Sequence, residues 1–451
     1  MVCAVKESES PLELSMTGIV KKLRSTFAQF EDHRTGGPNQ SYTMEDAALS
    51  AFSVFFTQSP SFLDHQRRIE QSGDVSNVQT IFGVHKTPSD NQVRNLLDPV
   101  SPQQVYPLIA EIGQRLNESG FLTNYRSVQG QMLIAIDGTD IFSSEKIFCP
   151  GCSIQKLKNG KTCYRHTALT PVIVAPGQAQ VIALPPEFVQ PQDGQDKQDC
   201  EVNAAKRWLM RWGSSYACWG VTLLGDDLYC HQPFCQAVLA QGMNFIVVCK
   251  PQSHALLYEW VADFERMGQR HTVQRSRWTG KEKLYECYSW VNQVPLCNRD
   301  DALMVNWCEL VITNAQGEAL FHNAWATSHL ITDDNVIELV AAGRARWKIE
   351  NENNNTLKNH GYHLEHNFGH AKQNLCALLA TLNLLAFLLH TTLEWIDERY
   401  RSLRKRLPSR RTFFDNLRAL LLYLTFSSWD HLMNFMLHAL QHERHPAPGS
   451  G

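Results

Sequence analysis

The sequence predicts an α/β protein whose sheet carries the functional site and whose two ends are helical. Between about residues 130 and 250, short apolar runs alternate with helical patterns, which indicates strands of a mainly parallel sheet. Four stretches of alternating polarity follow between 271 and 328 with no helical pattern between them, which indicates a β-rich block. We therefore expect a helical N-terminal region (1–125), a central domain (126–395) and a helical C-terminal region (396–451).

The overall composition is that of a globular protein. The chain has 451 residues, enough for two or three domains with a large core. Hydrophobic residues make up 43% of it and charged residues 19%. The net charge is −3, so no overall positive field points to a nucleic-acid partner. Any contact with DNA must therefore come from local basic patches.

Cysteine usage and the N-terminal segment predict a cytoplasmic protein. There are 13 cysteines, an odd number, and the first 13 residues carry charges and no apolar core, so we expect no signal peptide. Thiols in a reducing compartment are free or bound to metal. The apolar run Leu375–Leu389 is shorter than the ~20 residues that span a bilayer, and it contains Thr381 and Asn383. We expect a buried core helix there, and no membrane partner.

The N-terminal region has recognisable helix starts. Thr43 precedes an acidic turn and the apolar run Ala47–Phe56, which predicts an N-cap. Ser89 is placed in the same way before a second helix. Basic residues are scattered through the region without forming a dense stripe. A helical DNA-binding region and a plain helical domain that packs on the core both fit this pattern.

Two predicted strands of the central domain end in an acid. The apolar run from Gln131 ends at Asp137, and the run Trp219–Leu224 is followed by Gly225 and Asp226. Carboxylates at the ends of adjacent strands lie within reach of one another, and a divalent metal relieves their repulsion. Mg²⁺ prefers such carboxylate oxygens together with water and phosphate oxygens. Acids at strand ends are common, and each taken singly is more often structural or solvated than catalytic.

A third acid lies on a predicted helix from Arg344 to Lys358, which contains no Pro or Gly. Arg346 and Glu350 are four residues apart and so share one face, and Lys358 follows two turns later. A helix packed over the sheet would add Glu350 to the two strand-end acids. Three carboxylates can hold two metal ions about 4 Å apart. The same charge pattern also occurs on solvated helices.

Three blocks of this chain resemble those of DDE transposases from bacterial insertion sequences. The blocks are Ile-Asp137-Gly-Thr, Leu-Leu-Gly-Asp226-Asp-Leu-Tyr229 and Arg346-Trp-Lys-Ile-Glu350. They are most similar to the group whose third block is a Tyr-Arg-Glu-Lys signature helix, over roughly residues 130 to 395. The resemblance implies an RNase H-like catalytic core with a β-rich insertion at about 271–328.

The resemblance also implies an activity. Asp137, Asp226 and Glu350 would be the catalytic ligands of Mg²⁺ or Mn²⁺, used to cleave transposon ends and to transfer the freed strand into target DNA. Arg346 would contact a phosphate or orient Glu350, and Lys358 would contact the DNA backbone. Partners would be double-stranded DNA and further copies of the chain in a synaptic complex in the bacterial cytoplasm, associated with the nucleoid when on DNA. An RNase H-like nuclease without strand transfer, or an inactive DNA-binding protein, are the alternatives.

The chain departs from the family pattern at two positions. Gly343 stands where the family has Tyr, and Leu357 stands where it has Lys, with Lys358 one residue later. Three further acids close in sequence to the chosen ligands are alternative candidates for the same metal-binding roles. Asp226 is preferred over its neighbour because of the Asp-x-x-Tyr spacing, and the rivals of the three ligands are, in chain order, Asp140, Asp227 and Glu352.

The densest basic run of the chain is 399–411, with seven positive charges in thirteen residues and no acid. Because the run is unneutralised in a chain of negative net charge, it favours a contact with the phosphate backbone. A solvated helix face is the alternative. We expect Arg404, Lys405 and Arg406 to bind DNA.

A cysteine and histidine pattern predicts a structural zinc ion. Its members are Cys149, Cys152, Cys163 and His166, with the spacing C-x2-C-x10-C-x2-H. Two close pairs joined by a short loop suit tetrahedral zinc. Buried thiols without metal are the alternative. A further His- and Asn-rich run at 353–370 fits a polar DNA-facing surface, a solvated loop or a metal site.

Overall fold

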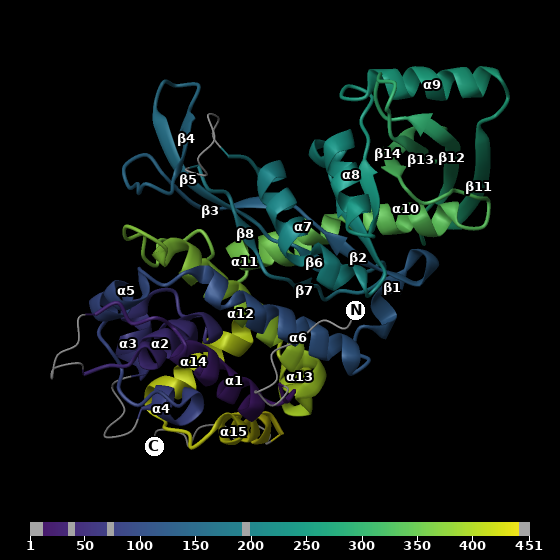
Figure 1. Ribbon diagram of the computed structural model, residues 1–451. Coiled ribbons are helices and arrows are strands. Elements are labelled where there is room, and N and C mark those ends of the chain that lie inside the picture. Colours follow the sequence, from purple (N-terminus) through teal and green to yellow (C-terminus); the bar gives the residue numbers. More distant parts are fainter. Residues whose placement is uncertain (1–11, 35–40, 70–75, 192–198, 442–451) are drawn as a thin grey trace. The chain divides into compact units, whose positions relative to one another are not determined.

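The structure is a computed structural model that describes residues 12–34, 41–69, 76–191 and 199–441 (Figure 1). The expectation that no signal peptide is present concerns residues that lie mostly outside these ranges. The chain folds as two compact units. The helical unit comprises Met1–Phe121, Ile147–Pro150 and Thr356–Gly451, and the sheet unit comprises Leu122–Lys146 and Gly151–Asn355. This division differs from the three consecutive regions expected above, because the two helical ends of the chain form one unit.

The helical unit is built from helices of both ends of the chain. Thr43 caps α2, since its Oγ1 accepts a hydrogen bond from the Asp46 backbone N–H at 2.9 Å, as predicted. The N-terminal helices are α1 (Met16–Ala28), α2 (Met44–Phe56), α3 (Phe62–Ile69), α4 (Asn77–Phe82), α5 (Asp90–Leu97) and α6 (Tyr106–Glu118). The C-terminal helices are α12 (Leu375–Ile396), α13 (Glu398–Arg406), α14 (Arg410–Tyr423) and α15 (Trp429–Gln441).

The core of the helical unit forms around α12, which packs against α2. By length and composition, α12 is the one helix in the described ranges that could cross a membrane, with a mean hydropathy of 1.8, but 89% of its apolar window is buried inside the protein. Two of its polar side chains donate hydrogen bonds inside the protein: Thr381 Oγ1 donates to Ala377 O at 2.8 Å, and Asn383 Nδ2 donates to Tyr362 O at 2.8 Å. This burial agrees with the expected core helix.

The sheet unit contains a ten-stranded sheet in the order β11-β12-β13-β14-β10-β9-β2-β6-β7, with β1 paired to β2. Its central strands β2, β9 and β10 are parallel, and all the other pairs are antiparallel. The expectation of a mainly parallel sheet is therefore wrong outside these three strands. The strands between residues 271 and 327 follow one another through short turns, which join antiparallel and not parallel neighbours. The strands are β1 (Arg126–Ser127), β2 (Gln131–Ala135), β6 (Val172–Val174), β7 (Ile182–Ala183), β9 (Val221–Gly225) and β10 (Asn244–Val248).

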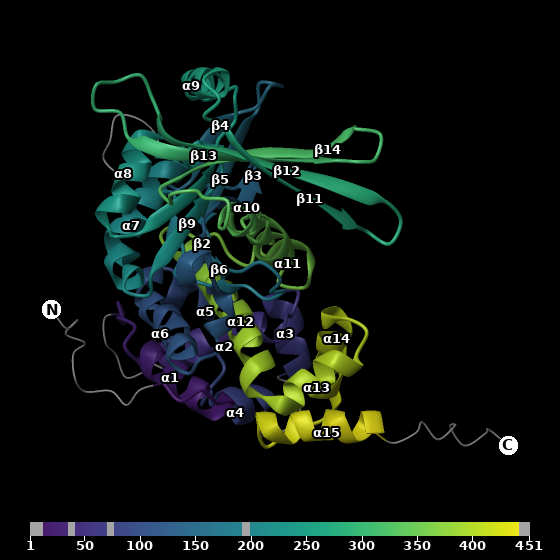
Figure 2. The ribbon, with the colours of Figure 1, turned by 90° about the vertical axis from the view of Figure 1, so that its right-hand side faces the viewer.

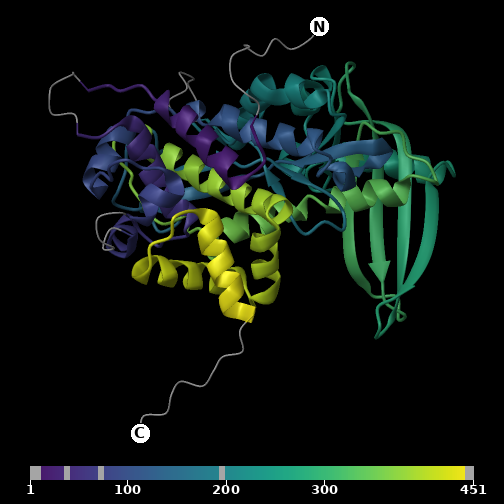
Figure 3. The same ribbon diagram turned by 90° about the horizontal axis from the view of Figure 1, so that it is seen from below.

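The predicted β-rich block is present and extends the central sheet. Its strands are β11 (His271–Trp278), β12 (Lys283–Pro295), β13 (Met304–Thr313) and β14 (Ala319–Thr327). They lie side by side in Figure 3, and β14 joins the block to β10. Helices α9 (Ala255–Arg266) and α10 (Val336–Arg344) lie on opposite faces of the block (Figure 2). The side chains of Trp290, Trp307 and Trp325 fill its interior.

A second, smaller sheet begins directly after Asp137. It contains β3 (Gly138–Ser144), β5 (Thr162–Leu169) and β4 (Ser153–Lys156), and β8 (Glu187–Phe188) pairs with β5. Helices α7 (Glu201–Ala217) and α8 (Gln232–Ala240) complete this unit with short 3₁₀ turns. The turn η4 (Asp227–Tyr229) directly follows Asp226.

Candidate active site

Two of the predicted acids lie at the same edge of the central sheet. Asp137 follows β2, and Asp226 follows β9. The two strands are parallel neighbours, with Ala135 opposite Leu224. Because parallel strands end at a common edge, the two carboxylates extend from that edge together. The arrangement is the one that the two apolar runs ending in an acid predict.

The third acid lies in a π-helical turn and not in the continuous α-helix expected over 344–358. Helix α10 ends at Arg344, the π turn η5 covers Ile349–Asn354, and a short helix α11 covers Asn355–Asn359. The expected shared face is nevertheless present, since Arg346 Nη2 lies 2.9 Å from Glu350 Oε1. Single π turns inside helices are rare and often occur at functional sites.

Hydrogen bonds hold the π turn on the sheet. Thr170 Oγ1 donates to Asn354 Oδ1 at 2.9 Å, and Asn353 Nδ2 donates to the same oxygen at 3.0 Å. The backbone N–H of Thr170 also donates to the carbonyl oxygen of Asp137 at 3.1 Å. One buried threonine therefore connects the backbone of the first acid to the turn that carries the third.

Negative charge gathers around Asp137. Burial, followed by the neighbouring carboxylates of Glu201, Glu350 and Asp226, raises the pKa of Asp137 to about 7, although Arg346 acts in the opposite direction. Mutual repulsion of this kind is relieved by a bound cation. Carboxylate oxygens are the donors that Mg²⁺ and Mn²⁺ prefer, so the residues present suit such ions.

Glu201 is a fourth acid of the site, which the sequence reasoning did not identify. Its Oε1 accepts hydrogen bonds from the Gly138 backbone N–H at 2.9 Å and from the Tyr229 hydroxyl at 2.6 Å. A Cβ at residue 138 would come within 2.3 Å of Glu201 Oε2, so a glycine lets the carboxylate approach. Glu201 begins α7, and nothing in its sequence neighbourhood distinguishes it from any acidic first turn. The one feature of the sequence that indicates a close contact here is Gly138, directly after Asp137.

The rival acids have structural partners. Asp227 Oδ1 accepts from the Lys250 backbone N–H at 2.7 Å, and its Oδ2 accepts from Ser253 Oγ at 2.5 Å. Asp140 lies 3.2 Å from Arg165 Nη1 and accepts from Thr167 Oγ1 at 2.7 Å. Glu352 is exposed, on the same π turn as Glu350.

Arg346 is a buried cation with unused donors. It is 7% exposed, and its Nε and Nη1 have no hydrogen-bond partner in the described part of the chain. The guanidinium also lies over the ring of Trp347, with its Cζ 5.5 Å from the ring centroid. A buried guanidinium with two unsatisfied donors can take an anionic ligand in a forked geometry.

The departures from the family pattern have a local explanation. A Cβ at Gly343 would come within 2.8 Å of Trp325 Nε1, so α10 packs too closely on β14 for a tyrosine there. Leu357 is fully buried. Lys358 belongs to the helical unit, where its Nζ lies 2.7 Å from Glu365 Oε1.

The basic run is partly neutralised, because four of its seven cations form ion pairs, which corrects the expectation of an unneutralised run. Leu407 and Pro408 divide it between α13 and α14, and acids outside 399–411 pair with several of its arginines. Arg404 Nε lies 3.4 Å from Glu394 Oε1, with the arginine side chain only 15% exposed, so its role as a surface phosphate contact is not supported. Lys405 and Arg406 are exposed, as a DNA contact requires. Further pairs are Arg399 with Asp397 and Asp430, Arg410 with Glu394, and Arg411 with Asp415.

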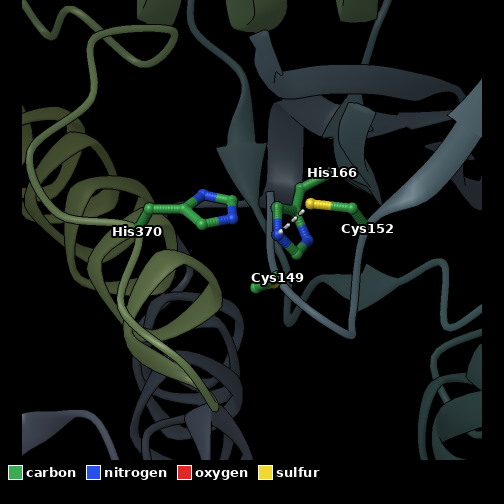
Figure 4. Close-up of side chains that lie close together, drawn as sticks. All are labelled: Cys149, Cys152, His166 and His370. Atoms are coloured by element: carbon green, nitrogen blue, oxygen red, sulfur yellow. Dashed lines mark hydrogen bonds between the residues drawn. The ribbon is translucent and has the colours of Figure 1, made fainter. Parts of the chain in front are cut away.

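The predicted zinc ligands are distributed over both units. In the sheet unit, Cys152 Sγ lies 3.4 Å from His166 Nε2, the contact dashed in Figure 4. In the helical unit, the ligand atoms of Cys149 and His370 lie within 4.8 Å of each other. Cys163 faces elsewhere, 3.3 Å from Ser143 Oγ.

The placement of Cys163 follows from strand geometry. Cys163 and His166 both lie on β5, three residues apart. Side chains of a strand alternate between its faces, so these two residues project to opposite sides. The spacing C-x2-H suits a metal knuckle on a turn but not on a strand, and Cys163 is accordingly separated from the Cys152–His166 pair. No disulfide is formed among the described cysteines.

Comparisons with known proteins find a distant likeness among solved structures. No family model and no curated protein matches the sequence. Among solved structures, the chain is similar to a piggyBac transposase in a synaptic complex with hairpin DNA, with 10% identity, a TM-score of 0.41, and coverage of 96% of this chain and 83% of that chain. The function is therefore inferred below from the residues of the site itself.

Proposed function

We propose that the chain is a DNA transposase of the DDE type, with an RNase H-like catalytic core related to those of bacterial insertion sequences. One observation carries the proposal. Asp137 and Asp226 end two adjacent parallel strands, and the charges of Asp226 and Glu350 both act on Asp137 and raise its pKa. Three acids brought together by two strands and a helical turn, with a buried arginine beside them, suit phosphoryl transfer on DNA.

Mg²⁺ or Mn²⁺ would be held by Asp137, Asp226 and Glu350. When bound, the ions supply charge neutralisation for the attacking and leaving oxygens of a phosphodiester. The side chains of the protein bind and position the phosphate. Arg346 offers its two unused donors to a phosphate, while its third nitrogen keeps Glu350 in place. Because phosphoryl transfer asks for positioning and charge stabilisation, a preorganised pair of this kind is well suited to it.

Glu201 acts as a positioning residue in this proposal. It touches the backbone after Asp137 and the hydroxyl of Tyr229, three residues after Asp226. Burial is the main cause of the raised pKa of Tyr229, and Glu201 adds to it, so the phenol keeps its proton and continues to donate. One side chain thereby ties together the loops that follow β2 and β9.

We also propose partners and a second metal ion for this chain. Partners are double-stranded DNA, as transposon ends and target, and further copies of the chain in a synaptic complex in the bacterial cytoplasm. Exposed Lys405 and Arg406 are candidates for backbone contacts. Zinc is proposed for the Cys152–His166 pair, whose sulfur and nitrogen lie close enough to share an ion.

The test is metal-dependent cleavage of DNA that carries the ends of the genetic element encoding the chain. Wild type is compared with Asp226→Asn and with the matched neighbour variant Asp227→Asn. We expect Asp226→Asn to abolish cleavage while DNA binding survives, and Asp227→Asn to retain cleavage at reduced thermal stability. Equal cleavage by wild type and Asp226→Asn would contradict the catalytic assignment.

The same assay separates the two related activities. Products that contain element ends joined to target DNA indicate strand transfer. Cleavage without joined products would favour the RNase H-like nuclease, and metal-independent binding without cleavage would favour an inactive DNA-binding protein.

A further inference from the structure

A second group of metal-ligating side chains lies in the sheet unit, apart from the carboxylates. Cys230 follows the turn η4, Cys249 follows β10, and His254 immediately precedes α9. Their ligand atoms all lie within 4.8 Å of one another, and all three residues are buried. Three segments of the chain therefore converge at this point.

The spacing of these atoms is close to that of a tetrahedral zinc site. Thiolate sulfurs bind zinc at about 2.3 Å and imidazole nitrogens at about 2.0–2.1 Å, so neighbouring ligand atoms are roughly 3.3–3.8 Å apart. From the upper limit of 4.8 Å, a contraction of at most about 1.5 Å brings the three side chains to such a geometry, by the same bond lengths. Soft thiolates with an imidazole select zinc-like ions, whereas the carboxylate site favours Mg²⁺ or Mn²⁺.

The imidazole of His254 provides a second, independent observation that points to a bound ion. Its side chain is only 5% exposed, yet its Nε2 has no hydrogen-bond partner among the described residues. The nearest charged atom is Asp227 Oδ1 at 3.4 Å. Buried polar nitrogens are normally satisfied, so an unsatisfied one next to two thiols is explained by an ion. In many metal sites a carboxylate lies beside a histidine ligand, either as a further ligand or as the group that orients the imidazole. Asp227 provides such a carboxylate next to His254.

An adjoining cavity provides room for the ion and for a water ligand. Its volume is about 250 Å³, and it is lined by Cys230, His254, Ser253 and Cys297 among others. Two of the three candidate ligands thus face the cavity. A metal ion could enter there without opening the core.

We propose that Cys230, Cys249 and His254 bind a zinc-like divalent cation, with a fourth ligand from the cavity side. Binding releases the two thiol protons and leaves neutral imidazole as the nitrogen donor. The ion clamps the segment after β9 to the segment after β10. Asp227 already joins the same segments through Lys250 and Ser253, so the ion reinforces an existing connection beside Asp226.

This site does not depend on the proposed transposase activity, and its test is independent of DNA. The full chain is produced in zinc-containing medium as a Cys152→Ser variant, so that the Cys152–His166 pair does not contribute. Bound metal is then measured by mass spectrometry. We expect about one equivalent of zinc per chain, falling to near zero in Cys230→Ala and Cys249→Ala, because a zinc site that loses one of two thiolates loses most of its affinity.

Cys308→Ala is the matched control, since Cys308 is a fully buried thiol outside the group. The Cys308→Ala variant should retain about one equivalent of zinc per chain. The proposal is overturned if the Cys152→Ser protein contains no zinc, or if Cys230→Ala retains as much as Cys308→Ala.

A second measurement needs no core substitution. The Cys152→Ser protein, stripped by a chelator, is titrated with Co²⁺. Sulfur-to-cobalt charge-transfer absorption is expected, whereas Co²⁺ held by carboxylates gives none. Asp226→Asn should leave this absorption unchanged, which separates this site from the candidate active site. Absence of the absorption would indicate two packed thiols beside a neutral histidine, and would refute the metal site.

Discussion

Asp137 has a pKa raised to about 7, against 3.8 for an ordinary aspartate, chiefly through burial and then through the neighbouring acids. Between these two values the folded protein keeps the proton, while the unfolded chain loses it. The free energy of unfolding contributed by this group therefore falls as the pH rises from about 4 to about 7, and is constant above. A cation that binds the ionised carboxylate reverses part of this loss.

We predict that Asp137→Asn, which cannot ionise, lacks this pH dependence. In the presence of a chelator, its melting temperature relative to wild type should rise as the pH increases through the window between the two pKa values. Thermal unfolding of both proteins across that window measures the difference. Other titrating groups cancel in the comparison. A difference that stays constant with pH would contradict the raised pKa.

Glu201 supports a second prediction for a single residue. Glu201→Gln removes a negative charge that raises the pKa of Asp137 but keeps an oxygen acceptor for Gly138 and Tyr229. The pKa of Asp137 should therefore fall, and metal-dependent cleavage should reach its plateau at lower pH than in wild type. The pH–rate profile reports the shift. Glu352→Gln, an exposed change on the π turn, serves as the control and should leave the profile in place.

At the scale of elements, the site depends on how α10 and the π turn pack on the sheet. Thr170 and Asn354 hold the turn, and the absence of a side chain at Gly343 lets α10 approach Trp325 on β14. The π turn begins at Ile349 and contains Glu350, so its geometry sets the position of that carboxylate. Sequence periodicity predicts a helix here but contains no signal for the inserted residue of a π turn.

Gly343→Ala tests the packing of α10. In an exposed helix interior this change usually stabilises by up to about 1 kcal/mol, because glycine is a poor helix former. Here the new Cβ would lie 2.8 Å from Trp325 Nε1, so we expect a loss of about 1–3 kcal/mol. Urea unfolding of both proteins shows whether the substitution lowers or raises the free energy of unfolding. A stabilised variant would show that the close approach of α10 to β14 is absent.

At the scale of the whole molecule, the helical unit joins the two ends of the chain. Asn77 on α4 is buried, and its Nδ2 donates to Leu421 O at 3.0 Å and Leu424 O at 2.8 Å. Its Oδ1 accepts from the Phe426 backbone N–H at 2.9 Å. One side chain near the N-terminus therefore satisfies three backbone groups near the end of α14.

Asn77→Ala should destabilise the protein by about 1–3 kcal/mol, because buried backbone groups lose their partners. The loss should appear as faster proteolysis within α14 and α15, measured by limited digestion and mass spectrometry. Asn434→Ala, an exposed change on α15, is the control. Equal digestion of the two variants would mean that Asn77 does not secure the C-terminal helices.

The local features of the fold could be predicted from the sequence. The apolar runs before Asp137 and Asp226 predict strands that end in an acid, and the two strands are adjacent in the sheet. The four stretches between 271 and 328 predict β11 to β14 within a few residues, and Thr43 predicts the start of α2. These features follow from hydrophobic periodicity and capping chemistry, which act over a few neighbouring residues.

The long-range features could not be predicted in this way, because they depend on contacts between distant segments of the chain. Glu201 joins the site from a helix 64 residues after Asp137, as their residue numbers show, through a contact that no local pattern encodes. Acids outside the basic run pair with four of its seven cations, and the strand β5 turns Cys163 away from His166. Cys230, Cys249 and His254 meet because two parallel strands end side by side. Such contacts depend on which segments the folded chain brings together, and composition and spacing along the sequence do not specify this.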